Sequence, residues 1–243
     1  MAPGSPESAR VELDKSGRAI RDMFSGVAPR YDLLNRLISG FLDEAWRRRA
    51  AAAVDAAPPG PVLDLCAGTG DQARAVRQRG RRVAAADFTV AMLALARHKL
   101  GRLAPPRPAP LAADALALPF PDGAFAGATV AFGLRNVADL DRSLHELARA
   151  IVPAGRLVVL EASVPENRLL RWGHRLWCKY GLLWLGRLLS PRASAYRYLP
   201  ASVVAFPQRE HFLEKMAAAG FTDLSYDDLS LGAVCLYRGT KTP

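Results

Sequence analysis

The stretch Pro61–Asp71, PVLDLCAGTGD, decides the fold class of this chain. A short apolar run leads into Gly68-Thr69-Gly70, and a polar stretch of helical character follows. Glycines allow the backbone to turn sharply and approach a ligand closely, and the first N–H groups of the next helix stay free to bind it. The stretch therefore predicts the strand, tight turn and helix that open a nucleotide-binding α/β unit.

Strand-like and helix-like segments alternate after this turn, which favours an α/β fold with a doubly wound, mostly parallel sheet. Ligands bind beyond the carboxyl ends of the strands in such sheets, so the candidate site residues are those that follow the strands. The expected strands are 62–65, 82–86, 111–113, 125–132 and 156–161, the expected helices are 71–79, 90–100 and 140–151, and an antiparallel pair, 221–227 and 231–237, completes the sheet.

The 243 residues suffice for one domain, which we place at 18–243, preceded by a polar lead, 1–17, that we expect to be disordered. Residues 18–57 show helical spacing of apolar side chains and predict a helical cap. The sequence shows neither a signal peptide nor an apolar stretch long enough to span a membrane. Three cysteines without metal-binding spacing favour free thiols in a reducing, cytoplasmic compartment.

Carboxylates and glycines predict the class of ligand. Asp87 closes the second expected strand, where its carboxylate can accept both hydroxyls of a ribose, and Phe88 can lie against an adenine face. Capping the next helix is the alternative role of Asp87. Asp71 stands where a dinucleotide-binding turn would continue towards a third glycine, and its charge would repel a pyrophosphate but suit an α-amino group. These features favour S-adenosyl-L-methionine over a dinucleotide.

Further stretches carry a family resemblance. They are MFSGVAPRYDLLNRLIS, VLDLCAGTGD, DALALPFPDGAFAGATVAFGLRNVAD, PAGRLVVLEASVP and YRYLPASVVAFP. With them the chain resembles the ubiquinone/menaquinone biosynthesis C-methyltransferases over nearly its whole length. The resemblance implies a Rossmann-like class I methyltransferase fold with a seven-stranded sheet, and a helical insertion after the fifth strand.

The resemblance also implies contacts to the cofactor at Thr69, at Asp87 on the ribose, and at Asp114 with Ala115 near the adenine. The chain departs from the family pattern at two positions of the expected site. Ala67 replaces a common glycine, and Ala131 replaces a common serine. The complete set of expected cofactor-binding residues is Asp64, Gly68, Thr69, Gly70, Asp87, Phe88, Asp114, Ala115 and Ala131.

The acceptor implied by the resemblance is a prenylated quinol, with demethylmenaquinol preferred. Methylation of a ring carbon needs an electron-rich ring and stabilisation of a developing phenolate. Arg135 and Asn136 follow the fourth strand and are the candidates for that role, and Tyr31 of the cap is a third. A carboxylate-paired arginine is the alternative for Arg135. Other acceptors also stay open, namely a ubiquinone precursor or another hydrophobic phenol, and so does a membrane-associated regulatory or scaffold protein that binds the cofactor without turnover.

The expected insertion, residues 166–200, lies largely in a stretch, 167–209, without any Asp or Glu, and the net charge of the chain is +10. Its apolar side chains at helical spacing are Leu169, Trp172, Leu176, Trp177, Tyr180, Leu183 and Trp184, and its basic ones are Arg171, His174, Arg175 and Lys179. This pattern favours an interfacial lid on an anionic membrane, with core packing or a homo-oligomer contact as alternatives. We expect no nucleic-acid partner, and no metal because the four histidines are scattered.

Overall fold

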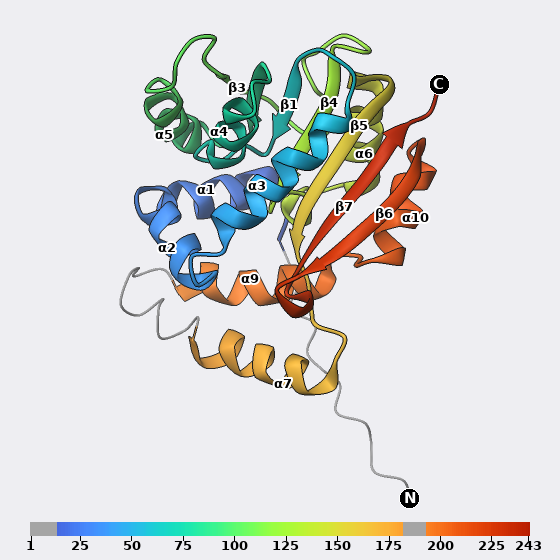
Figure 1. Ribbon diagram of the computed structural model, residues 1–243. Coiled ribbons are helices and arrows are strands. Elements are labelled where there is room, and N and C mark those ends of the chain that lie inside the picture. The colour runs from blue at the N-terminus through green and yellow to red at the C-terminus, as the bar shows by residue number, and fades with distance from the viewer. Residues whose placement is uncertain (1–13, 182–192) are drawn as a thin grey trace, which may run out of the picture.

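The computed structural model describes residues 14–181 and 193–243, without the side chains of residues 29, 178, 179 and 193–197. Seven strands form one sheet in the order β3-β2-β1-β4-β5-β7-β6 (Figure 1). Strands β1 to β5 run parallel, and β7 is antiparallel to both β5 and β6. The predicted seven-stranded, mostly parallel sheet is confirmed. The strands are β1 Val62–Leu65, β2 Val83–Asp87, β3 Ala109–Ala112, β4 Phe125–Ala131, β5 Ile151–Ala162, β6 Phe221–Leu229 and β7 Val234–Lys241.

Helices cover both faces of the sheet, and each face has its own apolar layer (Figure 1). Helices α3 and α4 pack on one face, and α6 and α10 pack on the other. Successive side chains of a strand point to opposite faces, so Leu157 and Val159 join the α6 side while Val158 and Leu160 join the α3 side. The helices are α1 Gly17–Val27, α2 Tyr31–Ile38, α3 Asp43–Ala53, α4 Asp71–Gln78, α5 Val90–Leu100, α6 Leu140–Ala150, α7 Arg168–Leu176, α9 Ala193–Ala205 and α10 Glu210–Ala218.

Several predicted boundaries move. β5 begins at Ile151 instead of residue 156, because the chain passes directly from α6 into the strand. β7 begins at Val234 instead of residue 231, because Ser230–Gly232 form a 3₁₀ turn in which all three residues have positive φ. The expected disordered lead is wrong at its end, since the Ser16 hydroxyl caps α1 by accepting from the Ala19 N–H; residues 1–13 lie outside the described residues.

The expected cap consists of α1, a 3₁₀ turn Ala28–Arg30, α2, α3 and a second 3₁₀ turn Val54–Ala56. The expected insertion contains α7, a π-helical turn Trp177–Gly181 and the start of α9; the predicted apolar positions Leu183 and Trp184 lie outside the described residues. Among the helices that the structure describes, none is long and apolar enough to cross a membrane.

Candidate active site

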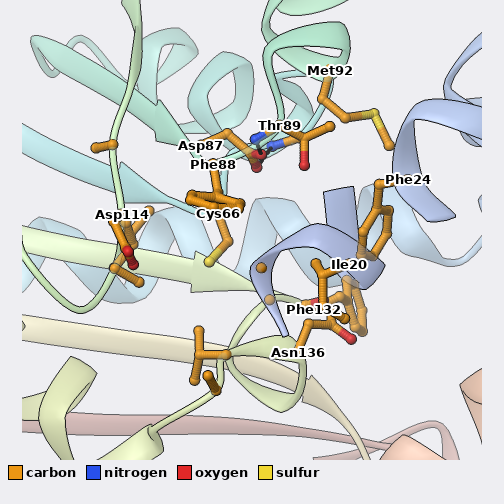
Figure 2. A pocket seen from close by; sticks show the side chains of 18 of the residues that line it. Ile20, Phe24, Cys66, Asp87, Phe88, Thr89, Met92, Asp114, Phe132 and Asn136 are labelled. Atoms are coloured by element: carbon orange, nitrogen blue, oxygen red, sulfur yellow. Dashed lines mark hydrogen bonds between the residues drawn. The ribbon is translucent and has the colours of Figure 1, made fainter. Parts of the chain in front are cut away.

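A cavity of about 890 Å³, counted with its open mouth, lies at the carboxyl ends of β1, β2 and β4. Figure 2 shows the side chains of Ile20 and Phe24 from α1 on one side of this first cavity and Asp114 on the other. Of the predicted site residues it contains Tyr31, Gly68, Asp87, Phe88, Asp114, Ala115, Ala131 and Asn136. The sheet therefore brings most of the expected cofactor residues together.

Asp87 joins the glycine turn to the start of α5. Its two carboxylate oxygens accept the Gly68 N–H at 2.8 Å and the Thr89 N–H at 2.7 Å. Burial raises the pKa of this carboxyl above its ordinary value, although these two N–H donors act in the opposite direction. An ionised carboxylate has about four lone-pair sites, so Asp87 keeps acceptor capacity for a ligand in the cavity.

The turn itself needs unusual backbone conformations. Gly68 and Gly70 have φ of +54° and +85°, and Cys66 adopts +56°, which is rare for a residue with a side chain. The Cys66 side chain lines the cavity, as does that of Phe88 (Figure 2). Burial raises the pKa of this thiol well above its usual range, so the sulfur stays protonated and is a poor nucleophile. Ala67 does not have positive φ, which explains why alanine replaces glycine there without strain.

Three predicted cofactor residues, Asp64, Thr69 and Gly70, do not line the cavity. The Thr69 hydroxyl faces the cap, where it donates to the Asp32 carboxylate at 2.5 Å. The predicted pairing of Asp71 with an α-amino group also needs correction, because Asp71 accepts from the Lys99 ammonium at 2.6 Å. Burial is the largest single effect on the pKa of Asp71 and raises it, but the charge and hydrogen bond of Lys99, together with the charges of Arg47 and Arg74, bring the pKa below its ordinary value.

Lys99 holds this polar cluster together. Its ammonium group donates to Asp32 at 2.7 Å and to Thr69 at 3.1 Å as well as to Asp71. Asp32 belongs to α2 and follows Tyr31 directly, whereas Thr69 belongs to the turn and Asp71 is the first residue of α4. The cluster therefore ties the helical cap to the glycine turn and fixes the position of Tyr31.

Replacing Lys99 with methionine is expected to loosen the cap. Two carboxylates lose their shared cation and repel each other, which should lower the free energy of unfolding by about 1–2 kcal/mol after allowance for the partial exposure of Asp32. Chemical denaturation measures this loss, and limited proteolysis should cut first within residues 17–57. The matched control is Lys215→Met, which removes an exposed pair with Asp141 and should cost less than about 0.5 kcal/mol. Equal losses in the two variants would contradict the role of Lys99.

Asp64 lies beneath the turn instead of in the cavity. Its side chain is fully buried, and the Thr129 hydroxyl donates to one carboxylate oxygen at 3.2 Å. The other oxygen has no hydrogen-bond partner among the described residues. Burial is the largest cause that raises the pKa of Asp64 to about 7.

This raised pKa predicts a pH dependence of stability. The folded state binds the proton of Asp64 more tightly than the unfolded state, so this contribution is fully present below about pH 4 and is lost as the pH rises through about 7. Between pH 5.5 and pH 8 the protein should lose on the order of 2 kcal/mol relative to Asp64→Asn, which stays neutral at both pH values. Urea unfolding of the two proteins at both pH values checks this, and parallel pH profiles would contradict it.

A second, larger cavity of about 2230 Å³, again counted with its mouth, lies between the cap, α7 and α9. It contains Arg135 but none of the predicted cofactor-binding residues. Tyr31 and Phe132 line both cavities, and they alone do so among the described lining residues. Phe24 meets the Tyr31 ring edge-on at 6.0 Å between centroids, and the Arg47 guanidinium lies 5.3 Å from the centroid of Phe132. Packing thus holds both rings at the junction of the two cavities.

Arg135 is more constrained than the sequence suggested. It is buried, and its Nη1 donates to the Glu161 carboxylate and to the Phe132 carbonyl. Its backbone N–H also donates to Glu161 at 3.3 Å. Burial is the largest single effect on the pKa of Arg135 and lowers it, but the charge and hydrogen bond of Glu161, together with Tyr31 and Tyr198, raise the pKa above its ordinary value, so Arg135 stays charged. Arg135 is therefore one half of a buried ion pair, which agrees with the alternative of a carboxylate-paired arginine. Its Nε has no partner among the described residues.

The buried polar atoms without partners in the described part of the chain also include Oδ1 of Asn136, which lines the first cavity, and the hydroxyl of Tyr198 on α9, which lines neither cavity. Burial raises the pKa of Tyr198, and the nearby Arg135 acts in the opposite direction. Buried polar groups are ordinarily satisfied, so unsatisfied ones beside a cavity indicate ligand positions.

Comparisons with known proteins agree with this geometry. The sequence matches the ubiE/COQ5 methyltransferase family over residues 12–241. The chain belongs to this family. It is 48% identical over 222 residues to the demethylmenaquinone methyltransferase of Thermus thermophilus, covering 90% of this chain and 100% of that protein. It is 42% identical over 236 residues to the demethylmenaquinone methyltransferase of Thermobifida fusca, covering 96% of this chain and 98% of that protein.

The fold of this methyltransferase also matches solved structures. A SAM-dependent methyltransferase of Thermotoga maritima, described as a possible histamine N-methyltransferase, superposes with a TM-score of 0.63 at 18% identity. The match covers 92% of this chain and 100% of that one. The predicted class I methyltransferase fold is confirmed.

Sequence reasoning missed several lining residues of the methyltransferase. Lys15, Ile20 and Phe24 enter the first cavity from the N-terminal side, and Met92 enters it from α5. Ile20 and Phe24 stand four residues apart on α1, which is a signal of an inward-facing helix side but not of a cavity wall. Glu161 directly follows an apolar run of a strand, as Asp64 and Asp87 do. This position could have identified Glu161 as a site residue from the sequence.

Within the described residues no cluster of His, Cys, Asp and Glu could hold a metal ion.

Proposed function

We propose that this methyltransferase transfers a methyl group from S-adenosyl-L-methionine to a ring carbon of a prenylated quinol, with demethylmenaquinol as the acceptor. The observation that carries the proposal is the meeting of two distinct cavities at Tyr31 and Phe132. One cavity has the groups that bind a nucleoside, and the other is large and partly apolar. Two substrates held in separate cavities that share one junction are held for direct group transfer.

The first cavity fits the donor. Asp87 keeps acceptor sites for ribose hydroxyls, and Phe88 offers an apolar face for the adenine. Arg21 already covers Phe88 at 4.6 Å from the ring centroid, so the adenine has the other face. Asp114 accepts the Leu116 N–H at 2.9 Å, stays exposed on the cavity wall and has capacity for the adenine amino group. When bound, S-adenosyl-L-methionine supplies an electrophilic methyl group on a sulfonium.

The second cavity fits the acceptor. A hydroquinol becomes more nucleophilic at carbon when a ring hydroxyl loses its proton, and the resulting oxyanion needs stabilisation. Arg135 offers a permanent positive charge at the cavity wall, and Glu161 holds that guanidinium in place. Arginine does not release or take up protons in this range, so Arg135 stabilises the oxyanion and does not act as the base. Asn136, the other candidate of the fourth strand, lines the first cavity and not the second, so Arg135 carries this role alone among the residues that follow β4.

The identity of the acceptor rests on the relatives, two of which are demethylmenaquinone methyltransferases at 42% and 48% identity. Their names give the acceptor class that we carry over to this chain. A prenylated quinol resides in a bilayer, so the enzyme works at the cytoplasmic surface of a membrane.

Turnover with defined acceptors tests the proposal. The protein is incubated in detergent with labelled S-adenosyl-L-methionine and reduced demethylmenaquinone or the reduced methoxy-benzoquinone precursor of ubiquinone. We expect labelled menaquinol as the main product when both acceptors compete. Cofactor binding without any methylated quinol would contradict the proposal and favour a regulatory or scaffold role. Preference for the benzoquinol would reassign the acceptor.

A further inference from the structure

Helix α7 presents its apolar side away from the protein. Leu169 and Trp172, which we call the outer face of α7, are 74% and 62% exposed. Arg171 and His174 lie on the other side of the helix and line the second cavity. A surface helix ordinarily buries its apolar stripe, whereas α7 exposes Leu169 and Trp172 to the solvent. Figure 1 shows α7 as the outermost helix, below α9 and away from the sheet.

The mouth of the second cavity is also apolar. Leu42 before α3, Trp177 after α7 and Val204 on α9 all line this cavity and are 47%, 44% and 72% exposed. Side chains that both line a cavity and face the solvent stand at its opening. Exposed apolar groups from three elements around one opening mark an interaction site.

The charge around this site favours an anionic partner. Residues 167–209 contain no Asp or Glu, and the chain carries a net charge of +10. Arg168 and Arg175 are exposed on α7 on either side of Trp172. Arginines that flank exposed tryptophan and leucine can keep their charge at lipid headgroups while the apolar side chains enter the acyl region.

We propose that the outer face of α7 docks on an anionic lipid bilayer, with the apolar mouth of the second cavity opening towards the lipid. With this orientation a quinol with a prenyl tail can pass from the bilayer into the second cavity without crossing water. This benefit of the docking rests on the proposed function. The docking itself depends only on the exposed groups and the basic segment.

Binding to vesicles tests the docking. Full-length protein is sedimented with vesicles of phosphatidylcholine containing one-third phosphatidylglycerol, and with vesicles of phosphatidylcholine alone. We expect binding to the anionic vesicles, and Leu169→Ser/Trp172→Ser should bind them about tenfold or more weakly. The matched control is Val90→Ser/Leu95→Ser, which removes two exposed apolar side chains from α5 at the far end of the molecule (Figure 1). The control should bind as the wild type does.

Three outcomes would overturn the proposal. The first is that the α7 variant binds anionic vesicles as tightly as the wild type, and the second is that the wild type does not bind them. The third is a wild-type dimer in sedimentation velocity that the α7 variant abolishes, without vesicle binding, which would make this face a contact between copies. Turnover of a short-tailed quinol in detergent should be equal in the α7 variant and the wild type. Failure of the docking therefore leaves that turnover intact, whereas failure of the proposed function removes it.

Discussion

Replacing Arg135 with methionine is expected to lower the free energy of unfolding by about 3–5 kcal/mol. The substitution leaves the Glu161 carboxylate buried without its cation, and Glu161 is fully buried. Desolvation of an unpaired charge is costly, whereas removal of both charges is far less so. Urea unfolding measures the loss.

The double variant Arg135→Met/Glu161→Gln is the control for this loss. It removes the charge of both partners, so it should recover a large part of the lost stability. Methyl transfer should be lost in both variants, because neither has the Arg135 guanidinium that we propose stabilises the oxyanion. Recovered stability without recovered activity distinguishes the contribution of the ion pair to folding from the contribution of Arg135 to the reaction. A double variant as unstable as the single one would show that the buried charge is not the cause.

Replacing Asp87 with alanine is expected to weaken binding of S-adenosyl-L-methionine by about tenfold to a thousandfold. Hydrogen bonds to a charged group contribute about 1.5–3 kcal/mol each, and each 1.4 kcal/mol changes the affinity tenfold. The variant also frees the Gly68 N–H, to which Asp87 is an acceptor at 2.8 Å, so the turn loses support. Isothermal titration calorimetry with S-adenosylhomocysteine measures the affinity.

Asp141→Ala is the control for Asp87, because it removes an exposed carboxylate that pairs with Lys215 and does not line the first cavity. Its affinity should equal that of the wild type. Unchanged affinity in Asp87→Ala would remove this carboxylate from the cofactor site and leave it only the role of joining the turn to α5.

The cofactor side of the site could be predicted from sequence because its residues follow strands directly. Asp87 ends β2, the glycines follow β1, and the carboxyl ends of parallel strands converge by topology. Thr69 belongs to the same turn, yet its side chain points away from the cavity. Its partners Asp32 and Lys99 lie 37 and 30 residues away in sequence, and local pattern does not reveal such pairs.

The acceptor side of the site was less predictable, because its contacts also join residues that are distant in the sequence. Arg135 was placed correctly after β4, but its partner Glu161 lies 26 residues away on the neighbouring strand. The pairing depends on the register of β4 against β5, which the sequence does not specify. The second cavity likewise arises from the cap, α7 and α9, which are distant in the chain and enclose it only after folding.

The central claim is that donor and acceptor occupy separate cavities and meet at Tyr31 and Phe132. A crystal structure of the protein with S-adenosylhomocysteine and demethylmenaquinone tests it most directly. We predict the ribose at Asp87, the quinone ring in the second cavity beside Arg135, and the sulfur and the ring carbon facing each other next to Tyr31 and Phe132. A quinone bound in the first cavity, or in the second with its ring away from that junction, would contradict the account.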